Sequence, residues 1–152
     1  MKVTEWEKRV GSESLCIGIA VSDFNKVVTD RLVEGALAYL ELAGIGRVEL
    51  LRVAGAWELP IAANRLFDAG CEGVVAVGAV IKGETDHYEV IVRESAAGLR
   101  EASLRAGRPI GNAVLAAHDL DQAMNRSEPG PGNKGHEAAA AVVDLARKVG
   151  RS

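Results

Sequence analysis

The chain of 152 residues has few cysteines and few aromatic residues: two Cys in all, with Phe, Trp and Tyr together at 4%. Two cysteines cannot form the framework of a disulfide-stapled domain. Cys16 and Cys71 both lie in apolar runs, so we predict that each is a buried, reduced thiol. Because aromatic side chains are rare, those that fall in loops are candidates for ligand binding.

The chain also lacks long hydrophobic runs and a large charge of either sign. No stretch approaches the ~18 uninterrupted apolar residues of a membrane span, and residues 1–9 contain no signal-peptide core. The formal net charge of −3 gives no general attraction to nucleic acid or to an anionic membrane. We therefore expect a cytoplasmic protein that binds neither nucleic acid nor membranes.

What the chain does have is the composition of a folded domain, with 48% hydrophobic and 26% charged residues. Short apolar runs alternate with stretches of helical periodicity. The pattern predicts strands at 15–21, 47–53, 73–81 and 110–116, and helices at 27–43, 58–69, 87–106, 120–125 and 134–149. The apolar stripe of the last helix is expected to comprise Ala138, Ala139, Ala141, Val142, Leu145 and Val149.

This alternation predicts an α/β fold, a three-layer sandwich in which a four-stranded parallel sheet is flanked by helices. One domain covers residues 1–152, and residues 1–13 are expected to form a flexible N-terminal arm. Ligands of such sheets collect beyond the carboxyl ends of the strands. The loops to inspect are therefore 22–26, 54–58, 82–86 and 117–119.

The first of these loops contains Phe24 and no phosphate-binding glycine pattern. This loop has no Gly-x-Gly-x-x-Gly, and Gly-x-x-x-x-Gly-Lys-Ser/Thr occurs nowhere in the chain, which argues against a dinucleotide or triphosphate site of the usual kind. Phe24 either covers the edge of the core or stacks on a flat heterocycle.

The second loop places small residues beside Trp57 and Glu58, in the run Ala-Gly-Ala-Trp-Glu-Leu-Pro. Small residues let a ligand approach the backbone closely. Glu58 stands at the start of a predicted helix. Its carboxylate either complements the helix dipole or accepts hydrogen bonds from ligand hydroxyl or ring N–H groups.

The third loop leads from a buried strand into the longest helix. Gly83 permits an unusual backbone angle, and the N–H groups of Glu84 and Thr85 could form an anion cradle at the helix start. The alternative is a capped helix start with acidic residues. A helix N-terminus favours the neutral imidazole of His87, which could then serve as an acid–base group.

The fourth region contains Arg126 and Lys134. The planar fork of an arginine suits a phosphate, although both cations could equally be solvated surface residues. We interpret His118 and His136 as surface residues, because nothing pairs them with other ligands at a zinc spacing. We therefore predict no metal.

Taken together, these loops carry a specific resemblance. The shared motifs are Phe24-Asn25, Glu34-Gly35-Ala36, Gly55-Ala56-Trp57-Glu58-Leu59-Pro60, Gly78-Ala79-Val80-Ile81-Lys82-Gly83-Glu84-Thr85 with His87-Tyr88, Gln122-Ala123, Arg126 and Asn133-Lys134-Gly135. From about residue 17 to residue 145, the chain resembles the 6,7-dimethyl-8-ribityllumazine synthase family, whose fold is flavodoxin-like.

The resemblance implies a reaction and an assembly. The reaction condenses 5-amino-6-(D-ribitylamino)uracil with 3,4-dihydroxy-2-butanone 4-phosphate, releasing phosphate and water in riboflavin biosynthesis, without metal or cofactor. The assembly is a homopentamer, which in some members extends to a decamer or a sixty-subunit icosahedral shell. Riboflavin synthase is a further partner that the resemblance implies.

The resemblance also implies roles for individual residues. Phe24 would stack on the pyrimidine, and His87 would transfer protons. The other implied pyrimidine and ribityl contacts are Ala56, Trp57, Glu58, Ala79, Val80, Ile81 and, from a neighbouring subunit, Asn112. The implied phosphate contacts are Glu84, Thr85 and Arg126, with Lys134 in support.

The chain departs from the family pattern at several positions near the fourth strand and in the second loop. Ala54 replaces a usual Pro, Asn112 replaces a frequent Phe, and Ala113 and Ala116 replace a usual Gly and Thr. Ser127-Glu128 stands where Ala-Gly is usual. These departures bear on substrate affinity and subunit geometry more than on the reaction.

Overall fold

The computed structural model describes residues 1–4, 6 and 15–150. Most of the expected N-terminal arm, residues 5 and 7–13, lies outside the described residues. The strands are β1 (Cys16–Ser22), β2 (Arg47–Val53), β3 (Gly73–Ile81) and β4 (Ile110–Ala117). The helices are α1 (Lys26–Leu42), α2 (Leu59–Asp68), α3 (His87–Ala106), α4 (Leu120–Arg126) and α5 (Lys134–Val149), with a 3₁₀ turn, η1 (Ala56–Glu58), before α2.

The four strands form one parallel sheet in the order β2-β1-β3-β4. β1 and β3 are therefore central. Every residue of β1 is buried, as are the first seven of β3, which explains their nearly continuous apolar sequence. The predicted α/β fold with a four-stranded parallel sheet is confirmed.

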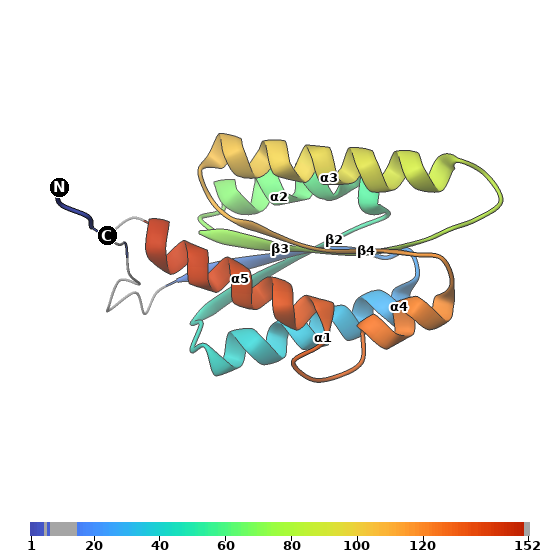
Figure 1. Cartoon of the computed structure of the whole chain (residues 1–152), viewed down its shortest axis with the longest axis horizontal. Helices are drawn as coiled ribbons and strands as arrows, with labels where there is room; N and C mark the ends of the chain where they lie inside the picture. The colour runs from blue at the N-terminus through green and yellow to red at the C-terminus, as the bar shows by residue number, and fades with distance from the viewer. Residues whose placement is uncertain (5, 7–14, 151–152) are drawn as a thin grey trace.

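Helices cover both faces of the sheet and complete three layers. Figure 1 shows α2 and α3 on one face, and α1, α4 and α5 on the other. A larger apolar cluster joins the sheet to α1 and α5, and a second cluster joins it to α2 and α3. In the described part of the chain, no helix combines the length and apolar character needed to cross a membrane.

Two glycines let α1 and α5 approach each other closely. A Cβ atom at Gly135 would overlap the carbonyl oxygen of Leu32, and one at Gly35 would overlap the side-chain oxygen of Asn133. Asn133 is 1% exposed and caps α5, since its Oδ1 accepts hydrogen bonds from the N–H groups of Gly135 and His136. The start of α5 is thereby fixed against α1.

The predicted apolar stripe of α5 is partly wrong. Ala138, Ala139 and Val142 are buried, but Leu145 and Val149 are 46% and 44% exposed, and Ala141 is also exposed. Val143 and Ala146 are buried in their place. The buried face of α5 is rotated by one residue relative to the predicted stripe, because α5 contacts both α1 and the sheet.

Cys16 and Cys71 are free, buried thiols, as predicted. Their sulfur atoms lie 3.4 Å apart, and Arg47 Nε donates to Cys16 Sγ at 3.2 Å. Burial raises the pKa of the Cys71 thiol to about 12, and the hydrogen bond with Cys16 acts in the same direction.

Candidate active site

A cavity of about 320 Å³ opens beyond the carboxyl ends of β1 and β3, where the topology predicts ligand binding. Its volume lies at the lower end of the range usual for small-molecule sites. The residues that line it are Ser22, Phe24, Gly55, Ala56, Trp57, Glu58, Ala79, Val80, Ile81, Gly83, Thr85, His87, Tyr88 and Ile91. Three of the four loops selected from the sequence therefore meet at one place.

The loop after β1 presents Phe24 to this cavity. The backbone N–H groups of Asp23 and Phe24 donate to the carbonyl oxygens of Val53 and Ala54, which holds the loop beside the end of β2. Phe24 is 70% exposed, so its ring does not cover the edge of the core. An exposed ring at the mouth of a cavity is available for stacking.

The loop after β2 folds into η1 and directs Trp57 and Glu58 to the same cavity. Glu58 Oε1 accepts a hydrogen bond from the Gly55 N–H at 3.1 Å, and the Glu58 N–H donates to the Gly55 carbonyl at 3.2 Å. These two contacts close the turn. Trp57 is 58% exposed, so it contributes a large apolar surface to solvent or to a ligand.

The loop after β3 places Thr85 and His87 at the start of α3. The His87 N–H donates to Thr85 Oγ1 at 3.4 Å, which fixes the hydroxyl beside the helix N-terminus. Gly83 does not use the unusual backbone angle that glycine permits, since its φ is not positive.

The end of β3 forms the floor of the cavity. Ala79 is 3% exposed, while Val80 and Ile81 are half-buried, so the sheet emerges from the core at this point. Tyr88 and Ile91 complete the wall from α3. Sequence reasoning did not select Ile91, because its spacing is that of any apolar helix position.

Four residues selected from the sequence do not line this cavity, although all four are described: Glu84, Asn112, Arg126 and Lys134. Arg126 is the last residue of α4, which lies with α1 and α5 on the other face of the sheet (Figure 1). Asn112 Oδ1 accepts the N–H of Val114 at 2.9 Å, and Lys134 pairs with Glu137 at 2.9 Å. Within one chain, Arg126 therefore belongs to the helix layer opposite α3 and does not line the cavity.

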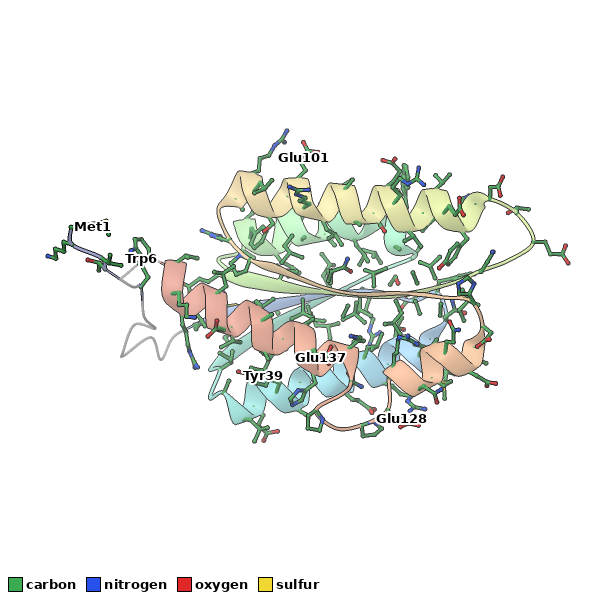
Figure 2. The ribbon with its side chains drawn as sticks, in the orientation of Figure 1. Met1, Trp6, Tyr39, Glu101, Glu128 and Glu137 are labelled. Carbon is green, nitrogen blue, oxygen red and sulfur yellow. The ribbon has the colours of Figure 1, made fainter. Side chains whose placement is uncertain are left out.

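The two other histidines differ in exposure. His118 is exposed, as predicted, whereas His136 is only partly exposed and contacts Tyr39 edge-on, with ring centroids 5.3 Å apart. Figure 2 shows Tyr39 in the α1–α5 layer, and neither ring lines the cavity. His136 is therefore a surface residue, as interpreted, and its ring also packs against Tyr39 of α1.

Fold and site together define a class of protein. It is an α/β enzyme-like domain whose parallel sheet carries, at its carboxyl edge, a crevice with three aromatic rings, a carboxylate, several hydroxyl groups and an imidazole. Such a crevice suits a flat organic ligand that needs both stacking and proton transfer.

Comparison with known proteins identifies the family. Residues 14–149 match the family model described as 6,7-dimethyl-8-ribityllumazine synthase. Proteins named 6,7-dimethyl-8-ribityllumazine synthase from Levilactobacillus brevis and Aquifex aeolicus are 46% and 40% identical. Their alignments cover 85% and 93% of this chain and 84% and 94% of the relatives. The protein of that name from Nitratidesulfovibrio vulgaris is 38% identical over 93% of this chain and 92% of its own length.

The chain therefore belongs to the 6,7-dimethyl-8-ribityllumazine synthase family. It is a transferase of riboflavin biosynthesis. The resemblance expected from the loop motifs is confirmed.

Proposed function

We propose that the crevice beyond β1 and β3 is the active site in which this chain forms 6,7-dimethyl-8-ribityllumazine. The substrates are 5-amino-6-(D-ribitylamino)uracil and 3,4-dihydroxy-2-butanone 4-phosphate, and phosphate and water are released. The observation that carries the proposal is the convergence of exposed Phe24 and Trp57 with Thr85 and His87 on one cavity. No step of this condensation calls for a redox group.

The pyrimidine binds at the aromatic side of the crevice. Phe24 stacks on the ring, because its face is exposed and no core residue competes for it. Trp57 and Glu58 hold the ring and its ribityl chain, and a carboxylate has acceptor capacity beyond the single bond from Gly55. Ala56, Ala79, Val80 and Ile81 shape the apolar wall.

The phosphate of the second substrate binds at the start of α3. The 20-residue helix begins at this end of the crevice, beside the Thr85 hydroxyl, and the positive end of its dipole favours an anion there. The exposed Glu84 carboxylate lies outside the cavity lining, so its backbone can serve the anion without charge repulsion. Arg126 supplies the planar cation, and Lys134 supports it.

His87 moves protons during the three bond changes. The 5-amino group adds to the ketone and water leaves to give an imine. Loss of the C3 proton and of phosphate from C4 then gives an enol, which tautomerises to a new ketone at C3. Finally the ribitylamino nitrogen attacks this new carbonyl and a second water leaves. Each step requires a proton at one oxygen or nitrogen and its removal at another. General acid–base help of this kind contributes roughly 10²–10⁴-fold, and holding both reactants together contributes much of the rest.

The site is completed between subunits of a homopentamer. Arg126 and Asn112 come from a neighbouring chain, which is supported by their absence from the cavity lining and by the position of α4 in the helix layer opposite α3. Exposed apolar side chains on α2 and α3 supply a surface for that contact: Ile61, Val90 and Leu104. The proposal extends to pentamers that associate into a decamer or a sixty-subunit shell, and to riboflavin synthase as a partner.

We further propose that residues 1–152 form one domain and that the protein works in the cytoplasm.

One assay tests the activity. The purified protein is mixed with both substrates, and lumazine absorbance and phosphate release are followed together. Product above the spontaneous background, with equal phosphate, is the expected result. Absence of product would indicate a binding protein that has lost turnover, and riboflavin formed from the lumazine alone would indicate a riboflavin synthase. Light scattering on the same sample reports the assembly.

A further inference from the structure

The chain segment that carries Arg126 is held from α1 by a single arginine. Arg31 Nε donates to the Ser127 carbonyl at 3.1 Å, and Nη2 donates to the Met124 carbonyl at 3.3 Å. Nη1 also contacts Met124 Sδ at 3.7 Å. These two carbonyls lie on either side of Arg126, so one guanidinium fixes the backbone both before and after it.

The carbonyls at a helix C-terminus have no partner within the helix and need one from elsewhere. α4 is only seven residues long and ends at Arg126 without a glycine after it. Its C-terminal turn is completed by Ser127, whose N–H and hydroxyl both donate to Met124 O. A cation beside this end also interacts favourably with the exposed carbonyl dipoles.

A buried amide fixes the same segment from the other side. Asn133 Nδ2 donates to the Ser127 carbonyl at 2.9 Å and to the Arg31 carbonyl at 3.1 Å. Ser127 and Asn133 are 0% and 1% exposed. The Ser127 carbonyl therefore accepts from both Arg31 and Asn133, and a buried network of this kind keeps one geometry because a broken bond leaves a buried polar group unpaired.

We infer that Arg31 is a positioning residue for Arg126, through which it sets the affinity of the enzyme for the phosphate-bearing substrate. The inference rests on the proposed function, in which Arg126 binds that phosphate. Arg31 itself does not line the cavity among the described residues. It acts by holding the backbone that aims the Arg126 side chain, and a bidentate contact to phosphate depends strongly on such alignment.

The test compares Arg31→Met with a matched control, Arg147→Met. Arg147 is also partly exposed and donates to a carbonyl at the end of a helix, Ala43 O at 2.7 Å, but it does so at the C-terminus of α1, away from α4. Both variants lose an arginine that donates hydrogen bonds to carbonyl groups at the C-terminal end of a helix. A purely structural role predicts the same kinetic behaviour in the two.

The expected result is a selective loss. Arg31→Met raises KM for 3,4-dihydroxy-2-butanone 4-phosphate by about tenfold, the scale of one weakened charge-assisted hydrogen bond. It also weakens competitive inhibition by inorganic phosphate by about the same factor. KM for the pyrimidine and kcat stay within about twofold, and Arg147→Met changes neither substrate's KM. Arg31→Lys, whose single ammonium replaces the fork, gives a smaller shift and serves if the Met variant fails to fold.

Arg126→Met separates the inference from the proposed function. If Arg126→Met raises KM for the phosphate substrate and the Arg31 variants do not, the inference alone is overturned. If Arg126→Met leaves that KM unchanged, the phosphate role of Arg126 is wrong and the inference falls with it. The double variant should be no worse than Arg126→Met alone, since Arg31 acts through Arg126. Additive losses would mean that Arg31 acts by another route.

Discussion

Asn25 donates a hydrogen bond from Nδ2 to the Ala79 carbonyl at 2.7 Å, and so joins the end of β1 to the end of β3. Its backbone has φ 59° and ψ 51°, the left-handed region, and within the described ranges no other residue except glycine has a positive φ. Asparagine tolerates this conformation better than most residues. Asn25 therefore sets the direction of the chain directly after Phe24.

Two substitutions at Asn25 separate the hydrogen bond from the backbone conformation. Asn25→Ala loses the bond and forces Ala into the left-handed region, and we expect a loss of about 2–3 kcal/mol of stability. Asn25→Gly loses the bond but keeps the conformation easily, so about 1 kcal/mol is expected. Urea unfolding at one fixed protein concentration measures both. Equal losses would show that the backbone conformation contributes nothing.

Replacement of Phe24 by leucine tests stacking on the pyrimidine. Phe24→Leu keeps an apolar side chain but removes the aromatic face, and base–aromatic stacking contributes about 1–3 kcal/mol. KM for the pyrimidine should rise by about tenfold or more, while the melting temperature stays unchanged because Phe24 is 70% exposed. Val27→Ala, at a similarly exposed neighbour, is the control and should leave KM unchanged. An unaltered KM in Phe24→Leu would remove the stacking role.

Replacement of His87 should slow the reaction without abolishing it. We expect His87→Gln to lower kcat by roughly 10²–10⁴-fold, the usual contribution of a general acid–base group, with pyrimidine binding preserved. His118→Gln, at another strand-end histidine that is exposed and lies on a different loop, should keep full activity. Single-turnover absorbance measurements, made beside the steady-state kcat, give the rate constant of the chemical steps without product release. A kcat within a factor of two of the wild type would exclude His87 as the proton-transfer group.

Cys71 gives the stability a pH dependence in alkali. Its pKa is raised from an ordinary value of about 8.5 to about 12 by burial. Between these two pH values the folded state keeps a proton that the unfolded chain loses. The contribution of the Cys71 thiol to the free energy of unfolding is therefore complete below pH ~8.5 and declines from pH ~8.5 to pH ~12. The stability difference between wild type and Cys71→Ala should shrink over that interval, as measured by urea unfolding. If the stability difference between wild type and Cys71→Ala does not change with pH, the thiol of Cys71 is not held neutral by burial.

The sequence predicts the elements well because their signals are local. Observed helix and strand bounds differ from the predicted ones by at most one residue at either end, since β1 and β3 are continuous apolar runs and glycines at positions 44, 70 and 107 follow the helices with positive φ. The 3₁₀ turn η1 was missed because it depends on the contact of the Glu58 side chain with Gly55. No periodicity reports a contact of that kind.

The candidate site was predictable where the loops follow the strands, and less so elsewhere. Phe24, Trp57 and His87 reach one cavity because the carboxyl ends of parallel strands share an edge. Ile91 was missed because it has the spacing of an ordinary helix residue. Arg126 does not line the cavity of the single chain, and which face of the sheet α4 covers is decided by packing against β4 and β3, which spacing along the chain does not encode.

The close approach of α1 and α5 at Gly35 and Gly135 has a consequence for mutational scanning. Any side chain at either position would meet Asn133 or the Leu32 backbone, so both should be as intolerant of replacement as a residue that touches substrate. Intolerance there would measure the separation of two helices and not chemistry. A mutational scan that measures activity alone would therefore indicate a second active site at these glycines, where there is none. Measuring the amount of folded protein in the same scan would show that these variants fail to fold.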